Sequence, residues 1–212
     1  MKFKESLKVK TISAVVIWGS AWALAELSLG HVLHLIGIPG MAGFVMFPVG
    51  AALMINVFFQ TGSRKAVMGT AVVAAGLKLL DLFLPLPNVF TVINPASAIL
   101  CEGIAVSVIY IPMAAGKPVL RQLGAIGLAA LSWRVMYLGL ALSQGLLASI
   151  PSIVGLGKAH VLYFIFLESL GNLVIFLPVL YVLRRIKSDH FRLPVPLTAM
   201  LFFAATAAQI IF

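Results

Sequence analysis

The sequence predicts an all-α protein: a polytopic transmembrane helical bundle with a six-helix core and a seventh, C-terminal helix. Hydrophobic residues make up 62% of the 212 residues and charged residues only 10%, whereas soluble domains have roughly 25% charged residues. The mean hydropathy is +1.12. Apolar stretches of about 20 residues, enough to cross a hydrocarbon core, recur along the whole chain. They are continuous and do not alternate, which favours helices over a β-barrel. We therefore expect residues 1–212 to form a single integral membrane domain.

Seven apolar segments account for the expected helices, and turn residues separate them. In order, the segments are 11–36, 39–60, 66–84, 93–113, 119–149, 160–183 and 194–212. The breaks fall at Pro39-Gly40, Thr61-Gly62-Ser63, Pro85 and Pro87, Gly116-Lys117-Pro118 and Pro151.

Each segment has its own justification. The first runs past Ala23-Leu24-Ala25, so we interpret it as a span and not as a cleaved signal peptide. The next five each contain an apolar window of about 19 residues, and with the first they form the core, residues 11–185. The segment 194–212 is also apolar, but whether it crosses the bilayer stays open.

Basic residues lie in alternate loops, and this pattern predicts the orientation. Lys and Arg resist translocation, so short loops that carry them stay in the cytoplasm. The opposite loops carry only Lys158. We expect the cell (cytoplasmic) membrane, a cytoplasmic N-terminus and an external C-terminus. The loops also account for the net charge of +9, so we expect no nucleic-acid partner. The cytoplasmic set is Lys2, Lys4, Lys8, Lys10, Arg64, Lys65, Lys117, Arg121, Arg184, Arg185, Lys187 and Arg192.

Charged residues inside the expected spans point to a functional site. A charge at mid-membrane costs at least about 2.5 kcal/mol, so such residues normally face the bundle interior and have partners. Residues from five segments fall at a similar depth, which indicates a shared polar cavity open toward the outer face. Helical spacing places further polar and aromatic residues on the same helix faces as these charged residues. The expected substrate-binding residues are Trp22, Glu26, His34, Lys78, Asn94, Glu102, Arg134, Tyr137, Glu168 and Asn172.

Structural roles compete with site roles for several of these residues. Lys78 and Asp81 are three residues apart and can simply neutralise each other. Arg134 can be a counter-ion to Glu102 or to Glu168.

Metal ligation by Glu26, His31 and His34 is a further alternative. Its spacing is loose, because His31 lies about 140° around the helix from Glu26. We otherwise expect no metal. The single Cys101 excludes a disulfide framework within the chain and a multi-cysteine metal site.

No catalytic motif occurs in the sequence. It lacks Gly-x-Ser-x-Gly, His-Glu-x-x-His and a Walker loop, so we expect no catalytic residue, no cofactor in this chain and no ATP hydrolysis by it. A polar layer with these charges suits a small ligand that has an anionic end and a cationic or hydrogen-bonding end. Arg134 would anchor a carboxylate or phosphate. Glu26, Glu102 and Glu168 would accept hydrogen bonds from amine or ring nitrogens.

The stretches "WGSAWALAELSLGHVLHLIGIPGMAGFVMFPVGAALM", "GLKLLDLFLP" and "VINPASAILCEG" resemble substrate-binding S components of energy-coupling-factor transporters. The resemblance covers roughly residues 11–185. It implies capture of a vitamin, cofactor precursor or metal ion, and toppling of the bundle driven by ATP hydrolysis in partner subunits. Ala21-x-x-x-Ala25 matches the family's contact with the transmembrane coupling subunit. The family's six-helix plan lacks the segment 194–212.

We therefore expect a membrane-embedded binding subunit for small-molecule uptake that is not itself an enzyme. Its expected partners are the lipid bilayer, the small molecule, a coupling subunit and an ATPase pair. One alternative is an intramembrane enzyme such as a hydrolase, which uses Glu26 and the nearby histidines, with or without a metal. Another is a structural membrane subunit, in which buried pairs fix the register of the helices.

Overall fold

The computed structural model describes residues 2–35, 37, 40–85, 88–148, 153–185 and 195–211. Every regular element in these ranges is a helix, which confirms the all-α class. The elements are α1 (Lys2–Ala25), η1 (Glu26–Gly30), α2 (His31–Leu35), α3 (Met41–Thr61), α4 (Arg64–Lys78), η2 (Leu79–Phe83), α5 (Phe90–Ala105), η3 (Val106–Tyr110), α6 (Ile111–Ala114), α7 (Val119–Ala148), η4 (Ile153–Leu156), α8 (Lys158–Leu162), η5 (Tyr163–Leu167), α9 (Glu168–Arg185) and α10 (Val195–Ile211).

Six helical runs in the described ranges are long and apolar enough to cross a membrane, which indicates a membrane-embedded protein. They are Lys8–Gly30, Met41–Thr61, Arg64–Phe83, Phe90–Ala114, Val119–Gln144 and Lys158–Arg185. These runs overlap the six expected core segments one for one, and several run continuously through a short π or 3₁₀ stretch.

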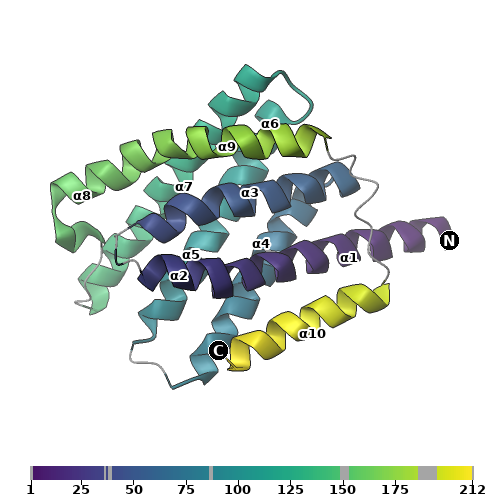
Figure 1. The fold of residues 1–212 in the computed structure, drawn as a ribbon, viewed down its shortest axis with the longest axis horizontal. Helices are drawn as coiled ribbons and strands as arrows, with labels where there is room; N and C mark the ends of the chain where they lie inside the picture. Colours follow the sequence, from purple (N-terminus) through teal and green to yellow (C-terminus); the bar gives the residue numbers. More distant parts are fainter. Residues whose placement is uncertain are drawn as a thin grey trace.

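The six runs pack in two layers that close into a ring. Figure 1 shows α9, α3 and α1 side by side in front, with α7, α5 and α4 behind them. Packing continues around the ring from α1 to α4, α5, α7, α9, α3 and back to α1. Helix α3 also contacts α4 and α5 and so bridges the two layers.

The turn between α3 and α4 shows how the predicted breaks work. Gly62 adopts φ +64°, and its N–H donates to Phe58 O at 2.7 Å, which ends α3. Ser63 then caps α4, since its side chain accepts a hydrogen bond from Ala66 N. A left-handed glycine followed by a capping serine reverses the chain in two residues.

Small residues let the large core side chains sit against neighbouring backbones. The Trp22 indole is fully buried and packs on Gly50 of α3, where a Cβ would overlap the ring. In the same way, Gly19 of α1 lies against Val73 of α4. Close approach of this kind is the usual basis of helix packing in membranes.

Helix α10 lies outside the ring, beside α1, and runs in the same direction (Figure 1). Ala205 packs with Ala23 and Leu77, and buried Gln209 donates to Ala23 O at 3.4 Å. A C-terminal helix is therefore confirmed for the expected segment 194–212. Its 17 residues are fewer than the roughly 20 that cross a bilayer, so a seventh span stays a prediction.

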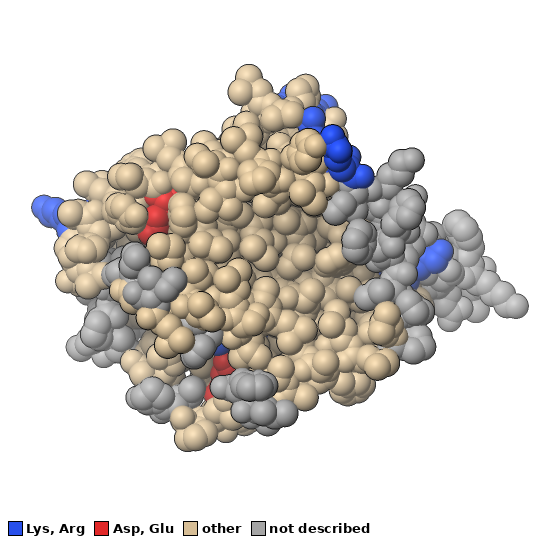
Figure 2. Space-filling model, in the orientation of Figure 1, with Lys and Arg blue, Asp and Glu red and all other residues tan. Residues whose placement is uncertain are grey.

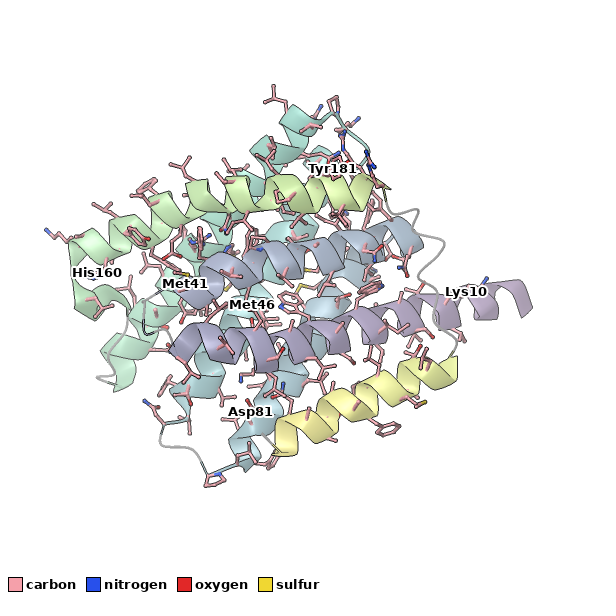
Figure 3. The ribbon with its side chains drawn as sticks, viewed as in Figure 1. Lys10, Met41, Met46, Asp81, His160 and Tyr181 are labelled. Atoms are coloured by element: carbon pink, nitrogen blue, oxygen red, sulfur yellow. The ribbon has the colours of Figure 1, made fainter. Side chains whose placement is uncertain are left out.

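Most of the basic side chains visible in Figure 2 lie toward one end of the bundle, and one lies at the opposite end. Figure 2 shows an almost uncharged face, with blue at the margins and two small red patches. Lys10 and Tyr181 lie at one end of the molecule and His160 at the other (Figure 3). Arg184 belongs to the first end and donates to Lys117 O. We call this end, where α1 and α4 begin and α9 ends, the basic end.

The contact between Trp22 and Gly50 makes a testable prediction about packing. Gly50→Ala should lower the free energy of unfolding by about 1–3 kcal/mol, because the added methyl group must displace a buried indole. The matched control is Gly124→Ala in α7, where a Cβ meets nothing within 4 Å. That change should raise stability by up to about 1 kcal/mol through helix propensity. Chemical unfolding in detergent measures both; equal effects would contradict the packing argument.

Candidate functional site

Four of the expected site residues interact electrostatically inside the ring. They are Glu26, Glu102, Arg134 and Glu168. Arg134 is fully buried, and Glu102 and Glu168 are each 3% exposed. Glu102 lies within electrostatic range of both Glu26 and Arg134. These side chains come from η1, α5, α7 and α9, so the group lies where four separate spans meet.

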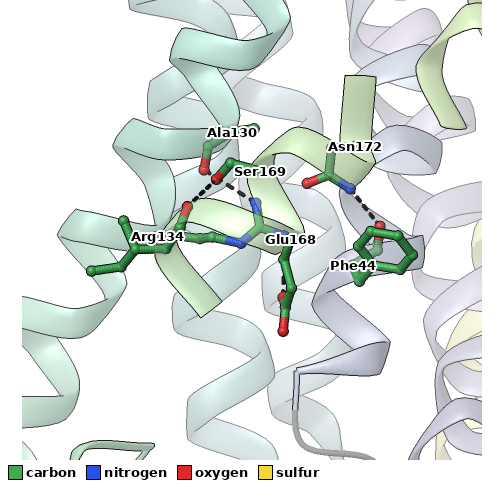
Figure 4. A network of polar contacts seen from close by, with 7 residues as sticks. Phe44, Ala130, Arg134, Glu168, Ser169 and Asn172 are labelled. Carbon is green, nitrogen blue, oxygen red and sulfur yellow. Dashed lines mark hydrogen bonds and ion pairs between the residues drawn. The ribbon is translucent and has the colours of Figure 1, made fainter. Parts of the chain in front are cut away.

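The closest contact in this group is the ion pair between Arg134 and Glu168. Arg134 Nη2 lies 3.3 Å from Glu168 Oε2, and Nη1 donates to Ala130 O at 3.2 Å (Figure 4). Of the two counter-ions that the sequence left open for Arg134, the structure pairs it with Glu168. The pair joins α7 to α9 in the bundle interior.

Glu168 also occupies the N-terminus of α3. Its carboxylate lies against the Cα of Gly40, the residue before α3, so closely that a Cβ there would overlap it. Gly40 has φ +83°, which a side chain would also disfavour. A helix N-terminus carries partial positive charge and attracts an anion. Glu168 is thus held from two sides, by a guanidinium and by a helix terminus.

Asn172 serves the backbone of α3. Its Nδ2 donates to Phe44 O at 2.6 Å (Figure 4). Phe44 lies four residues before Pro48, which is inside α3 and has no N–H to donate to that carbonyl. Asn172 therefore replaces the hydrogen bond that Pro48 cannot make. In an apolar interior such replacement is required, since no water is at hand to do it.

Aromatic rings enclose the guanidinium of Arg134. Its Cζ lies 4.6 Å from the ring centroid of Trp133 and 5.4 Å from that of Phe164. Trp133 also stacks on Phe47 at 5.9 Å and contacts Tyr137 at 6.2 Å. Cation–π contacts in a desolvated site stabilise the charge by about 2 kcal/mol. The rings shield Arg134 from the hydrocarbon around the bundle.

Several polar atoms in the ring interior have no hydrogen-bond partner among the described residues. Native proteins contain only a few buried unsatisfied polar groups per 100 residues, and each calls for an explanation. The atoms on expected site residues and on Trp133 are Trp22 Nε1, Asn94 Oδ1, Glu102 Oε2, Trp133 Nε1, Arg134 Nε and Asn172 Oδ1. They include two on groups that carry opposite charge, Glu102 and Arg134.

Each of the three glutamates adjoins a stretch of π-helix. Glu26 opens η1, Glu168 directly follows η5, and Glu102 lies one turn before η3. In each case a serine hydroxyl donates to a nearby carbonyl: Ser28 to Leu24 O, Ser107 to Ile104 O and Ser169 to Ile165 O. Short π-helical stretches of this kind are frequent at functional sites.

Lys78 and Asp81 form the pair that their spacing predicts. Lys78 Nζ lies 2.6 Å from Asp81 Oδ2, and the side chains are 15% and 10% exposed. Figure 3 places Asp81 at the margin of the molecule, near the C-terminal end of α10. Glu26 lies within electrostatic range of Lys78, so this pair adjoins the interior group without belonging to it.

Some of the remaining expected residues lie in the described part of the structure, and others do not. The side chains of His31 and His34 lie outside the described part of the structure, and the predicted metal site falls there with them. Of the two expected partner-contact residues, Ala25 packs against the main core and Ala21 is half-buried.

Sequence reasoning missed some residues that shape the site. Gly40 and Phe44 on α3, and Phe164 in η5, carried no charge or polar group that could single them out. Pro48 is a usable signal for Phe44, since a proline inside a span leaves the carbonyl four residues earlier without a donor. Trp133 adjoins Arg134 in sequence, but a core role fitted it equally well.

Searches against protein-family models, curated proteins and solved structures find no match to this chain.

The pair between Arg134 and Glu168 predicts a specific stability pattern. Arg134→Gln should lower the free energy of unfolding by about 3–5 kcal/mol, because it leaves a buried carboxylate without its cation. The double variant Arg134→Gln/Glu168→Gln should lose at least about 0.5 kcal/mol less than the sum of the single losses. Arg121→Gln, at an exposed position of the same helix, should change stability by less than about 0.5 kcal/mol. Strict additivity of the two single changes would rule out a direct pair.

The role of Asn172 can be tested through Pro48. Asn172→Ala should cost about 1–3 kcal/mol, since Phe44 O loses its donor. In a Pro48→Ala background the same change should cost less, because the new N–H at position 48 can bond Phe44 O. Pro95→Ala, a proline change inside α5, is the control and should leave the cost of Asn172→Ala unchanged. A cost that is equal in all three backgrounds would show that Asn172 acts elsewhere.

Proposed function

We propose that this protein is the substrate-binding subunit of an uptake system for a small molecule, similar to the S component of an energy-coupling-factor transporter. It binds its ligand in the interior of the bundle, at the group formed by Glu26, Glu102 and Arg134. In this proposal it acts in the cell membrane, with the N-terminus in the cytoplasm and the C-terminus outside. It does not transform the ligand.

The observation that carries this proposal is a pair of buried polar atoms without hydrogen-bond partners in the described part of the interior. Glu102 Oε2 and Arg134 Nε are buried, and neither has a hydrogen-bond partner among the described residues. Glu102 also has no cation within 4.0 Å in the described part of the chain. A buried carboxyl group without a hydrogen-bond partner is unfavourable. A ligand that hydrogen-bonds to Glu102 would remove this penalty, so binding energy is available at this position.

The geometry favours a ligand that is rich in donors or positively charged. Arg134 already uses Nη2 on Glu168 and Nη1 on Ala130 O, which leaves Nε as its donor without a partner. The carboxylates of Glu102 and Glu26 are acceptors, and Trp22 and Trp133 offer flat apolar faces. A vitamin or cofactor precursor with an amine or ring nitrogen fits this set, and a carbonyl or carboxylate on it could accept from Arg134 Nε.

Energy for transport would come from partner subunits. The chain has no Walker motif, so in the proposed system an ATPase pair hydrolyses ATP and a coupling subunit contacts this bundle. The partner contact proposed from the resemblance lies at Ala21 and Ala25 of α1. Helix α10 packs on the same helix, through Ala23, so a coupling subunit would have to dock beside α10 or displace it.

A thermal-shift experiment tests ligand binding. Purified protein in detergent is heated with thiamine as a cationic probe, pyridoxamine as an amine probe and pantothenate as an anionic probe. At least one of the two nitrogen bases should raise the melting temperature, and pantothenate should have less effect. Glu102→Gln should abolish the shift, since it replaces one of the two acceptor oxygens of this side chain by an NH₂ donor.

The control is Asp81→Asn, because that carboxylate is paired with Lys78 outside the interior group. It should keep the ligand response of the wild type. Copurification with an ATPase pair would support the coupled mechanism. If no probe stabilises the protein, and Glu102→Gln only changes stability in a ligand-independent way, the interior charges are structural and the uptake proposal fails.

A further inference from the structure

A cavity lies at the basic end, and none of the residues of the group around Arg134 lines it. It has a volume of about 220 Å³ and lies between the ends of α3 and α9, η3 and the start of α7. Its charged lining residues are Lys117 and Arg184, and no carboxylate lines it among the described residues. Two cations without an anion make this a site for a negatively charged group.

Hydrogen bonds hold the loop that carries Lys117 in place. Gln122 Nε2 donates to Lys117 O at 2.6 Å, and Arg184 Nη2 donates to the same carbonyl at 3.2 Å. Tyr110 Oη donates to Gln122 Oε1 at 3.3 Å. Tyr110 and Gln122 are 1% and 6% exposed, so the inner wall is a buried polar network. The cavity is therefore preorganised by three different helical runs.

The other lining residues are mostly apolar, and one of them reaches the surface of the bundle. Leu180 is buried, whereas Phe59, near the end of α3, is 45% exposed. In a membrane-embedded bundle that surface contacts lipid. A cavity with a cationic wall, an apolar wall and an exposed aromatic edge has the polarity of a lipid at the membrane interface, where the headgroup meets the acyl chains.

We propose that this cavity binds the phosphate-containing headgroup of an anionic membrane lipid, with Lys117 and Arg184 on the phosphate and Phe59 and Leu180 against the start of the acyl chains. The volume is below the roughly 300–1,000 Å³ of pockets for drug-sized ligands, so it suits a headgroup and not a whole organic cofactor. The inference is independent of the proposed uptake function, because the cavity shares no lining residue with the group of Glu26, Glu102 and Arg134.

The test is a melting-temperature measurement in a neutral detergent with phosphatidylglycerol, phosphatidylcholine or glycerol 3-phosphate added. At about 100 times its Kd, phosphatidylglycerol should raise the melting temperature of the wild type by roughly 5–10 °C. Phosphatidylcholine, which is zwitterionic, should have a much smaller effect. Native mass spectrometry of the purified protein should show retained anionic lipid.

Lys117→Gln should remove most of the phosphatidylglycerol shift, and Lys117→Arg should keep it, since it preserves the charge. Arg64→Gln is the matched control: Arg64 is exposed at the start of α4 and does not line the cavity. Arg184→Gln provides a second variant if Lys117→Gln does not fold. Equal shifts with both lipids, an unchanged response of Lys117→Gln, or a shift with glycerol 3-phosphate as large as with the lipid would each overturn the proposal.

Discussion

The bundle depends on satisfying polar groups where water is absent, and the junction of α3, α7 and α9 shows how this is done. Arg134 on α7 pairs with Glu168 at the start of α9, and that carboxylate also lies at the N-terminus of α3. One turn further along α9, Asn172 supplies the donor that Pro48 removes from Phe44. Each of these contacts avoids the cost of several kcal/mol that an unsatisfied polar group has in an apolar medium. Together they fix the mutual position of three spans, which apolar packing alone leaves free to slide.

These structural ties separate the polar residues into two classes. Asn172 Oδ1 and Asp81 Oδ1 lack partners among the described residues, but Glu168, Asn172 and Asp81 each have at least one hydrogen-bond or ion-pair partner there. Glu102 does not, although it is as buried as Glu168. Arg134 belongs to both classes, since two of its nitrogens are engaged and Nε is without a partner in the described residues. Buried networks are stable when their members find partners, and Glu102 is the member of this group for which the described residues supply no hydrogen-bond or ion-pair partner, which makes it the best position for a ligand.

The sequence predicted the helical class, the six core segments and the pair of Lys78 with Asp81, because each follows from a local rule: hydropathy over about 20 residues, turn residues, or i,i+3 spacing. It also singled out Arg134 and Glu168, since charge is conspicuous in an apolar chain. It could not choose between Glu102 and Glu168 as the partner of Arg134, because that choice depends on how three helices pack. The π-helical stretches beside the glutamates, and the place that Gly40 makes for a carboxylate, have no local signature. Asn172 was expected to bind substrate, whereas its Nδ2 serves the backbone at Pro48.

The two ends of the bundle differ in charge for a reason that links topology to binding. In the proposed topology, basic residues in alternate loops face the cytoplasm, and in the structure Arg184 bonds the loop of Lys117. The anionic leaflet that such residues prefer is also a source of lipid phosphate. The same residues that would set the orientation can therefore bind a headgroup, and the polar network of Tyr110 and Gln122 holds the loop of Lys117 beside the cavity. The proposed lipid site thus requires no cation beyond those that the topology already supplies.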